Sequence, residues 1–176
     1  MVSLQFYSEK DFNGVNYPLD QIQAGYTSTA ASALKRISER NTGLEFAVTV
    51  FSNEKPAGFF TLDFGDDKLD ATDNPNSVLL RSLSVNPEFQ GKGIGKAVML
   101  QIDAFVRKNF KECNEIVLAV NHDNSSAYEL YCKAGYHDGG RTKTGRNGLQ
   151  YLMHKNFKKF LIRIFMFGVI LSSKLR

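Results

Sequence analysis

The 176-residue sequence has no tryptophan, only two cysteines and only three histidines, and these scarcities exclude several classes of protein. Cys113 and Cys132 have neither the spacing of metal ligands nor the density of a disulfide-stabilised secreted domain. The three histidines, His122, His137 and His154, are scattered along the chain, so the sequence predicts no metal site. Two reduced thiols are typical of a cytoplasmic protein, and we expect that localisation.

Long apolar segments are also missing. The first residues lack the basic and apolar regions of a signal peptide. The most apolar stretch runs from Phe160 to Leu171 and contains 12 residues, of which only Arg163 is charged. It is too short to span a bilayer, so no membrane span is predicted. The tail 158–176 fits three interpretations: an extra element packed on the domain or on a twin subunit, as in a homodimer, a contact with a membrane interface, or a disordered or non-native extension.

Composition and charge indicate one globular domain, which we place at residues 1–157. Hydrophobic residues make up 43% of the chain and charged residues 23%, which is ordinary for a globular protein. Residues 1–80 hold 6 Lys/Arg and 11 Asp/Glu, a net charge of −5, whereas residues 81–176 hold 16 and 7, a net charge of +9. The asymmetry indicates either solvated surface charge or a cationic acceptor meeting an anionic cofactor. No nucleic-acid partner is predicted, because no basic stripe is interleaved with exposed aromatics.

The chain is organised around the segment Leu83–Lys96, which is rich in glycine. An apolar strand is predicted from Val78 to Val85, a turn at Asn86–Pro87, and an apolar-periodic helix from about Lys96 to Asn109. Around this centre the sequence predicts further elements: a first strand near Leu4–Phe6, one or two helices within Pro18–Arg40, a hairpin of Leu44–Ser52 and Ala57–Phe64 with its turn at Asn53–Pro56, a strand and helix at Ile116–Val120 and Ser125–Ala134, and a last hairpin of Tyr136–Thr142 and Leu149–Asn156.

The glycine-rich segment has the character of an anion-binding site. Gly91, Gly93 and Gly95 let the backbone approach a ligand without a Cβ atom in the way. The helix that follows has unpaired N–H groups and the positive end of its dipole at its N-terminus. Lys92 and Lys96 add positive charge. Together these features predict a site for a pyrophosphate.

Two well-known phosphate-binding motifs do not match this segment. A P-loop requires glycine where Gln90 stands and a hydroxyl where Ala97 follows Gly95-Lys96. A dinucleotide-binding fingerprint requires glycine at Lys96 and an acidic residue at the end of the next strand, where Asn121 stands. Both are therefore rejected, and Gln90-x-x-Gly93-x-Gly95 remains.

This hexapeptide resembles the pyrophosphate loop of the GNAT superfamily, the acyl-CoA-dependent N-acetyltransferases. A second stretch, residues 115–136, resembles the other half of the cofactor site of that family, with matching residues at Asn124, Ala127, Leu130-Tyr131, Lys133 and Gly135-Tyr136. The two motifs stand in the family's order and at its spacing. The resemblance is clear over residues 78–156 and loose before them.

The resemblance implies a fold and a cofactor. The implied fold is α+β: a mixed, mostly antiparallel sheet of six to seven strands, splayed between the fourth and fifth strands, with helices on both faces. The opening between the splayed strands would take the pantetheine arm of acetyl-CoA, to which the strand offers backbone groups. The residues implied to bind acetyl-CoA are Leu83, Ser84, Val85, Gln90, Gly91, Lys92, Gly93, Ile94, Gly95, Lys96, Asn121, Asn124 and Tyr131.

The implied reaction moves an acetyl group from acetyl-CoA to a primary amine of a small molecule or peptide, by direct attack in a ternary complex. Tyr131 would protonate the leaving thiolate, and a backbone N–H near Val85 would polarise the thioester carbonyl. The general base stays open, because Ser82 and Ser84 occupy the positions where relatives carry a glutamate or a water chain. A water relay to Glu45 or to an aspartate is one option. The rival hypothesis is a non-catalytic module that binds or senses acyl-CoA.

Two features bear on the acceptor. Five aspartates fall within eleven residues at Asp63, Asp66, Asp67, Asp70 and Asp73. They indicate a solvated surface loop or a collar that attracts a protonated amine, whereas a calcium loop is rejected because the EF-hand spacing is absent. The resemblance also implies that Tyr17, Tyr26 and Tyr151 are candidates for the wall of the acceptor pocket.

Overall fold

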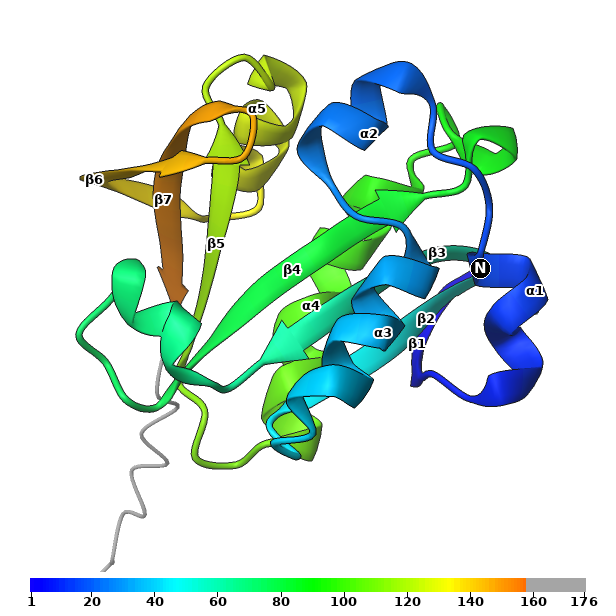
Figure 1. Cartoon of the computed structure of the whole chain (residues 1–176), viewed down its shortest axis with the longest axis horizontal. Coiled ribbons are helices and arrows are strands. Elements are labelled where there is room, and N and C mark those ends of the chain that lie inside the picture. The colour runs from blue at the N-terminus through cyan, green and yellow to red at the C-terminus, as the bar shows by residue number, and fades with distance from the viewer. Residues whose placement is uncertain (158–176) are drawn as a thin grey trace, which may run out of the picture.

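The computed structural model describes residues 1–157 and shows one seven-stranded sheet with helices on both faces (Figure 1). The strand order is β1-β2-β3-β4-β5-β7-β6, and every neighbouring pair is antiparallel except β4–β5. The predicted α+β class and mixed sheet are confirmed, whereas the predicted tail lies outside the described residues. The elements in chain order are β1 (Val2–Phe6), η1 (Glu9–Asp11), α1 (Phe12–Val15), α2 (Gln21–Tyr26), α3 (Ala30–Arg40), β2 (Glu45–Ser52), β3 (Lys55–Asp63), η2 (Asp66–Asp70), β4 (Ser77–Val85), η3 (Pro87–Phe89), α4 (Ile94–Asn109), β5 (Glu115–Asn121), α5 (Ser125–Lys133), β6 (His137–Gly145) and β7 (Gly148–Asn156).

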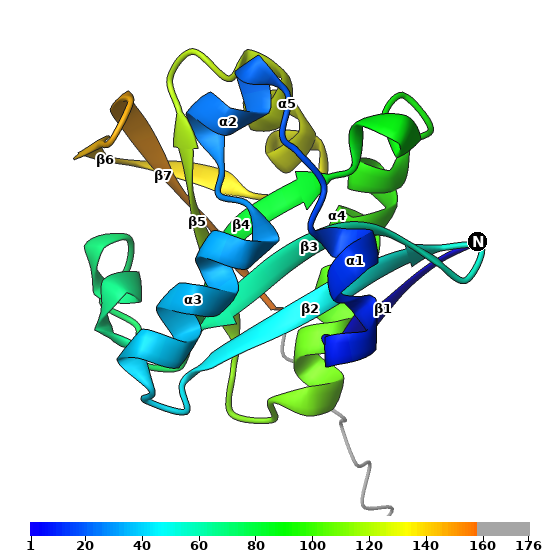
Figure 2. The same ribbon diagram turned by 45° about the vertical axis from the view of Figure 1, so that its right-hand side comes forward.

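The main core lies between α4 and the sheet. Val98, Met99, Ile102 and Val106 recur at helical spacing along α4 and are all buried, as are the strand residues they pack with. Helices α1 and α3 cover the opposite face, and Figure 2 shows the sheet between these two layers. No helix within residues 1–157 is long and apolar enough to cross a membrane.

The β2–β3 hairpin closes with a shorter turn than the sequence suggested. Asn53 and Glu54 both have left-handed φ values, 47° and 67°, as a two-residue hairpin turn of type I′ requires. Lys55 and Pro56, which we had assigned to the turn, are the first residues of β3. Asparagine tolerates this conformation well, so Asn53 carried the signal for the tighter turn.

Strands β4 and β5 pair over only four residues each and then separate. Their parallel register runs from Ser77–Glu115 to Leu80–Leu118. Figure 1 shows the two strands together near the bottom of the view and apart toward the top, which confirms the predicted splay. β5 stays paired with β7 along its whole length, so it follows the final hairpin rather than β4.

A β-bulge lies at the point where β4 leaves β5. Phe59 of β3 pairs with Ser84 and Thr61 pairs with Arg81, so that Ser82 and Leu83 together oppose one residue of β3. Ser82 has φ = 54°, which is uncommon for a residue other than glycine. A bulge increases local twist and redirects backbone groups. The strained backbone therefore lies in the wall of the opening that the splay creates.

Candidate functional site

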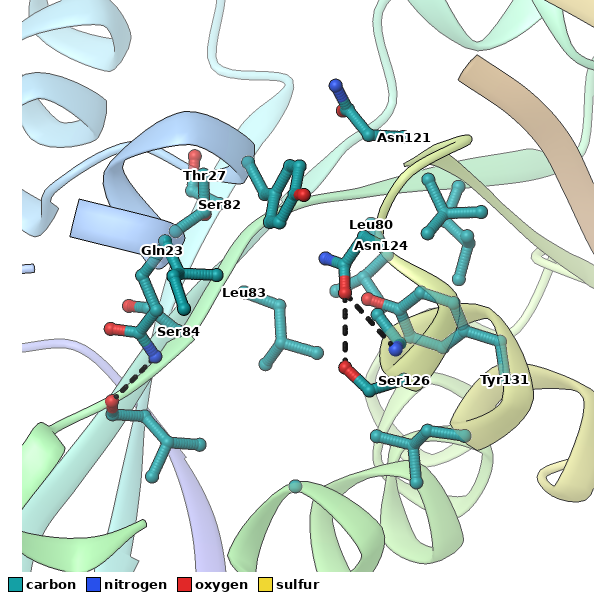
Figure 3. Close-up of a pocket in the computed structure, with 18 of the residues that line it drawn as sticks. Gln23, Thr27, Leu80, Ser82, Leu83, Ser84, Asn121, Asn124, Ser126 and Tyr131 are labelled. Carbon is teal, nitrogen blue, oxygen red and sulfur yellow. Dashed lines mark hydrogen bonds between the residues drawn. The ribbon is translucent and has the colours of Figure 1, made fainter. Parts of the chain in front are cut away.

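Two connected cavities occupy the opening between β4 and β5. The first, of about 390 Å³, is bordered by α2, β4, β5, α5, Gln90 and Gly95, and we call it the helix-side cavity (Figure 3). The second, of about 300 Å³, extends toward the turn of the β6–β7 hairpin, and we call it the hairpin-side cavity. The two share a stretch of wall formed by Tyr26, Thr27, Leu80, Arg81, Ser82, Ala119 and Asn121. A ligand can therefore enter from either side and reach the same wall.

The glycine-rich loop ends at the N-terminus of α4, at the edge of the helix-side cavity. Gly91 and Gly93 have φ values of 70° and 74°, and Gly93 is the N-cap of α4, with no side-chain capping hydrogen bond. The first N–H of the helix to find an acceptor is that of Ala97, which donates to the Gly93 carbonyl. The N–H groups of Ile94, Gly95 and Lys96 have no acceptor within residues 1–157. Together with the helix dipole they can hold an anion.

Several side chains of this loop make contacts within the protein. Lys92 donates to the Glu88 carbonyl and its Nζ lies 5.3 Å from the centre of the Phe89 ring. Ile94 is buried in the core, so only its backbone can reach a ligand. Gln90 donates to the Val85 carbonyl at 3.3 Å. Anion binding at this end therefore depends on the backbone, with Lys96 exposed in the first turn of α4.

The free part of β4 forms one wall of the helix-side cavity. Leu83, Ser84 and Val85 all contribute to that wall. The Ser84 hydroxyl is 2.8 Å from the hydroxyl of Tyr17, which is buried in the core rather than exposed in a pocket. The Val85 carbonyl also accepts from Nε2 of Gln23 in α2, at 3.1 Å. Helix α2 is thus tied to the end of β4, a contact that the sequence did not reveal.

Two asparagines follow β5 and differ in what their side chains leave free. Asn124 caps α5: its Oδ1 accepts from the Ala127 N–H at 3.2 Å and from the Ser126 hydroxyl at 3.3 Å. Its Nδ2 has no partner within the described residues. Asn121 donates to the Asn147 carbonyl and accepts from Gln150, so both ends of its amide hold the β6–β7 hairpin. Asn124 can therefore donate to a ligand, while Asn121 shapes the shared wall.

Tyr131 lies on α5 opposite the free edge of β4 (Figure 3). Its ring packs 5.9 Å from that of Tyr136, and its hydroxyl forms no hydrogen bond with any described residue. Burial raises the pKa of Tyr131 to about 12. The phenol therefore keeps its proton at neutral pH and points an available O–H toward the cavity.

One side of the hairpin-side cavity is bordered by contacts between the β6–β7 turn and α2. Arg146 donates to the Ala24 carbonyl at 3.3 Å, and Nδ2 of Asn147 donates to the Gly25 carbonyl. Tyr26, a predicted wall residue, lines both cavities. Tyr151, another, packs against His122 and Tyr128 and lines neither. The hairpin thus bridges the opening through its turn.

Four of the five aspartates in the acidic loop are paired with arginine or lysine residues rather than free to attract a cation. Asp63 bonds to Arg40 and Arg81, Asp67 to the same two arginines, Asp70 to Lys143, and Asp73 to Arg141. Hydrogen bonding from Arg40, reinforced by Arg81, lowers the pKa of Asp67 below its usual range. The interpretation of the loop as a collar for a protonated amine is therefore weakened.

Glu45, one option for a water-relayed base, is a buried counter-ion. Its Oε2 accepts from Arg36 at 2.9 Å and its Oε1 from Arg40 at 3.2 Å. It lines neither cavity. Both oxygens are occupied, so the geometry gives Glu45 a structural role in holding α3 against β2.

Comparison with known proteins decides the family. A family model described as the acetyltransferase (GNAT) family matches residues 15–136. The chain belongs to this family. A relative of this GNAT chain, the uncharacterized N-acetyltransferase YbbJ of Bacillus subtilis (strain 168), is 34% identical over 157 residues, which cover 87% of this chain and 96% of that protein.

Solved structures share the fold of the GNAT chain. A spermidine N-acetyltransferase from Vibrio cholerae, in complex with CoA and spermine, superposes with a TM-score of 0.66 at 18% identity over 91% of this chain and 98% of that one. The aminoglycoside acetyltransferase AAC(6')-Ib, in complex with coenzyme A, superposes with a TM-score of 0.69 at 19% identity over 89% and 95%. At these identities the likeness establishes the fold alone.

The GNAT chain brings most of the predicted site residues to one cavity. Eight of the thirteen line the helix-side cavity: Leu83, Ser84, Val85, Gln90, Gly95, Asn121, Asn124 and Tyr131. The other five continue along the loop and first turn of α4: Gly91, Lys92, Gly93, Ile94 and Lys96. Sequence reasoning missed Gln23 and Thr27, which line the cavity and whose Oε1 and Oγ1 atoms are buried without a hydrogen-bond partner among residues 1–157.

Proposed function

We propose that this protein is a cytoplasmic N-acetyltransferase that moves the acetyl group of acetyl-CoA to a primary amine in a ternary complex. The observation that carries the proposal is the arrangement of the helix-side cavity. The unpaired N–H groups of α4 lie at its edge, the free strand β4 forms one wall, and the Tyr131 hydroxyl points in from the other. Acetyl-CoA has a pyrophosphate, an amide-bearing arm and a thioester, and the groups at these three places match them in order.

The residues of the cavity have separate tasks in this proposal. The N–H groups of Ile94, Gly95 and Lys96 hold the pyrophosphate with the help of the α4 dipole. Nδ2 of Asn124 donates to the pantetheine arm, and a backbone N–H near the β4 bulge polarises the thioester carbonyl. Tyr131 gives its proton to the departing sulfur. Acetyl-CoA supplies the activated acetyl group, so no residue of this chain needs to carry it covalently.

The competing function is an acyl-CoA-binding module without turnover, and one observation favours it. The cavities are lined by two carboxylates, Asp20 and Asp67. Asp20 caps α2 by accepting from the Gln23 N–H, and Asp67 accepts from Arg40 and Arg81. Neither is poised as a free general base, which an enzyme would need unless its acceptor arrives deprotonated or loses its proton through water.

The test combines calorimetry with a thiol-release assay. Titration of the purified full chain with acetyl-CoA is expected to give 1:1 binding, and a mixed panel of amines is expected to include at least one that releases the CoA thiol. Absence of binding by the folded protein would overturn the acetyltransferase proposal. Binding without release by any amine would establish the binding module instead.

Substitutions at Asn124 separate its cap from its ligand contact. Asn124→Ala removes both, so we expect the free energy of unfolding to fall by about 1 kcal/mol and acetyl-CoA binding to weaken about tenfold. Asn124→Asp keeps an oxygen for the Ala127 N–H but loses the Nδ2 donor. It is expected to preserve stability and to weaken binding to the same degree or more. Wild-type affinity in Asn124→Asp would reduce Asn124 to a helix cap.

A further inference from the structure

We infer that the hairpin-side cavity takes an acceptor amine that carries an anionic group, a carboxylate or a phosphate. The inference rests on the proposed function, since the cavity would hold the acceptor. The residues assigned to the anion are Arg81, Lys143 and Arg146, with Arg36 behind them. They come from α3, β4 and the β6–β7 hairpin, three segments that are far apart in the sequence and border the same cavity.

The charge of the cavity wall is the first support. Four cationic side chains line it, those of Arg36, Arg81, Lys143 and Arg146, against one carboxylate, that of Asp67. Oδ2 of Asp67 accepts hydrogen bonds from both Arg40 and Arg81, so its charge is already balanced. Arg36 pairs with Glu45 and Lys143 with the exposed Asp70. The positive potential of the wall therefore comes mainly from Arg146, which has no carboxylate partner in the described chain.

The unused donors are the second support. Arg81 bonds to its two aspartates through Nη1, and its Nε and Nη2 have no partner within residues 1–157. Arg146 contacts only a backbone carbonyl through Nη2, without any carboxylate partner in the described chain. Planar guanidinium groups bind carboxylate and phosphate in a bidentate manner. Arg146 is thus equipped for an anion and has no carboxylate partner in the described chain, and Arg81 keeps two donor nitrogens free beside its own ion pairs.

The Lys143 side chain can leave its ion pair with Asp70 with little loss of stability. Lys143 pairs with Asp70 at the surface, where the Lys143 side chain is 38% exposed and the Asp70 side chain 59% exposed. Surface pairs of this kind contribute little to stability, because water competes for both charges. The ammonium can therefore turn from Asp70 to a ligand in the cavity.

The position of the cations fits an amine directed at the shared wall. Arg81 lines both cavities, next to Ser82 of the bulge. Thr27 also lines both, and its Oγ1 is buried without a partner. An acceptor held by its anionic group against Arg81, Lys143 and Arg146 can place its amine near Thr27 and the site proposed for the thioester.

The proposed acceptor differs in charge from the molecules named with two acetyltransferases of the same fold. Spermine and kanamycin, named with two acetyltransferases of the same fold, are polycations. A polycation entering this cavity would meet four cationic side chains, one of which, Arg146, has no carboxylate partner in the described chain, and no carboxylate free to pair with the ligand. Like charges in a confined site oppose binding, so polyamines and aminoglycosides are expected to be poor acceptors here.

The test compares pairs of acceptors that differ in one anionic group, with two polycations alongside them. Thiol release at saturating acetyl-CoA would be measured with leucine and leucinamide, with phosphoethanolamine and ethanolamine, and with spermidine and kanamycin. The member that carries the carboxylate or phosphate is expected, in at least one pair, to have a kcat/KM about tenfold or more above the partner that lacks it, and the polycations are expected to be slower still. The two pairs distinguish carboxylate from phosphate.

Single substitutions test whether Arg146 and Lys143 bind the anionic group of the acceptor. Arg146→Gln and Lys143→Gln are each expected to raise KM for the preferred anionic acceptor about tenfold while kcat stays nearly constant. Arg141→Gln removes the same charge from β6 at a residue that pairs with Asp73 and lines neither cavity, so its KM is expected to match the wild type. Equal KM values in all three variants would overturn the assignment.

The failures of the two proposals remain distinguishable. If acetyl-CoA does not bind in calorimetry, the proposed function fails. If acetyl-CoA binds but spermidine, kanamycin, leucinamide or ethanolamine is a better acceptor than leucine and phosphoethanolamine, only the anionic-acceptor inference fails. Binding of acetyl-CoA with no thiol release by any panel member overturns both the enzymatic proposal and the inference.

Discussion

Replacing Tyr131 with phenylalanine is expected to lower the rate of acetyl transfer by about 10²–10⁴-fold, the usual contribution of a positioned general acid. The substitution removes one oxygen and leaves the ring packed beside Tyr136. The hydroxyl has no hydrogen-bond partner within residues 1–157, so its loss breaks no contact that stabilises the fold. Stability and acetyl-CoA affinity are therefore expected to remain close to wild type, while single-turnover thiol release slows.

The pKa of Tyr131 predicts how the rates of the wild type and of Tyr131→Phe depend on pH. Burial raises it to about 12, so the phenol stays protonated throughout the range in which enzymes are usually assayed. Loss of the Tyr131 proton would begin to slow the wild type only as the pH approaches that value. Between pH 6 and pH 10 the two rate profiles are thus expected to have the same shape and to differ in height.

Tyr128→Phe is the matched control for Tyr131→Phe. Tyr128 lies on the same helix, lines neither cavity and packs against Tyr151. Tyr128→Phe is expected to release thiol at the rate of the wild type. If Tyr131→Phe also releases thiol at the wild-type rate in single-turnover conditions, Tyr131 is not the acid, and protonation must come from solvent.

The sequence predicted those parts of the fold that depend on local patterns. Glycines followed by an apolar-periodic helix predicted the loop and α4, although the helix begins at Ile94 rather than near Lys96. The splay came from the family resemblance, since no pattern within Val78–Val85 shows where pairing with β5 ends. Loop and helix could be located from residues close in the chain, whereas the splay depends on partners far away.

The parts that escaped prediction depend on contacts between distant residues. Nothing in the identity of Ser82 signals a left-handed backbone, which the register between β3 and β4 imposes. The aspartates after β3 were recognised as a cluster, but their partners Arg40, Arg81 and Lys143 lie on α3, β4 and β6. A count of charges along the chain cannot show such pairing. The acidic half therefore suggested a cationic acceptor, and the folded cavity suggests an anionic one.

Gly93→Asp is expected to weaken the binding of acetyl-CoA about 100-fold or more. Gly93 is the N-cap of α4 and has φ = 74°. An aspartate there would put a negative charge beside the N–H groups proposed to hold the pyrophosphate. Two unit charges 4 Å apart repel by about 4 kcal/mol at an effective dielectric constant of 20. A fall in affinity of about 100-fold or more, some 2.7 kcal/mol, is therefore expected in calorimetry.

Gly93→Asn separates this charge from backbone strain. Asparagine has nearly the same shape as aspartate and is among the residues that best tolerate a left-handed φ, but it is neutral. A Cβ atom at Gly93 would meet no heavy atom within 4 Å, so neither variant is expected to clash with the fold. We expect Gly93→Asn to bind acetyl-CoA within about tenfold of the wild type, and the gap between the two variants to narrow as salt screens the charge. Equal affinities of the folded Asp and Asn variants would show that the anion is bound elsewhere, because only the charge at the N-terminus of α4 distinguishes them.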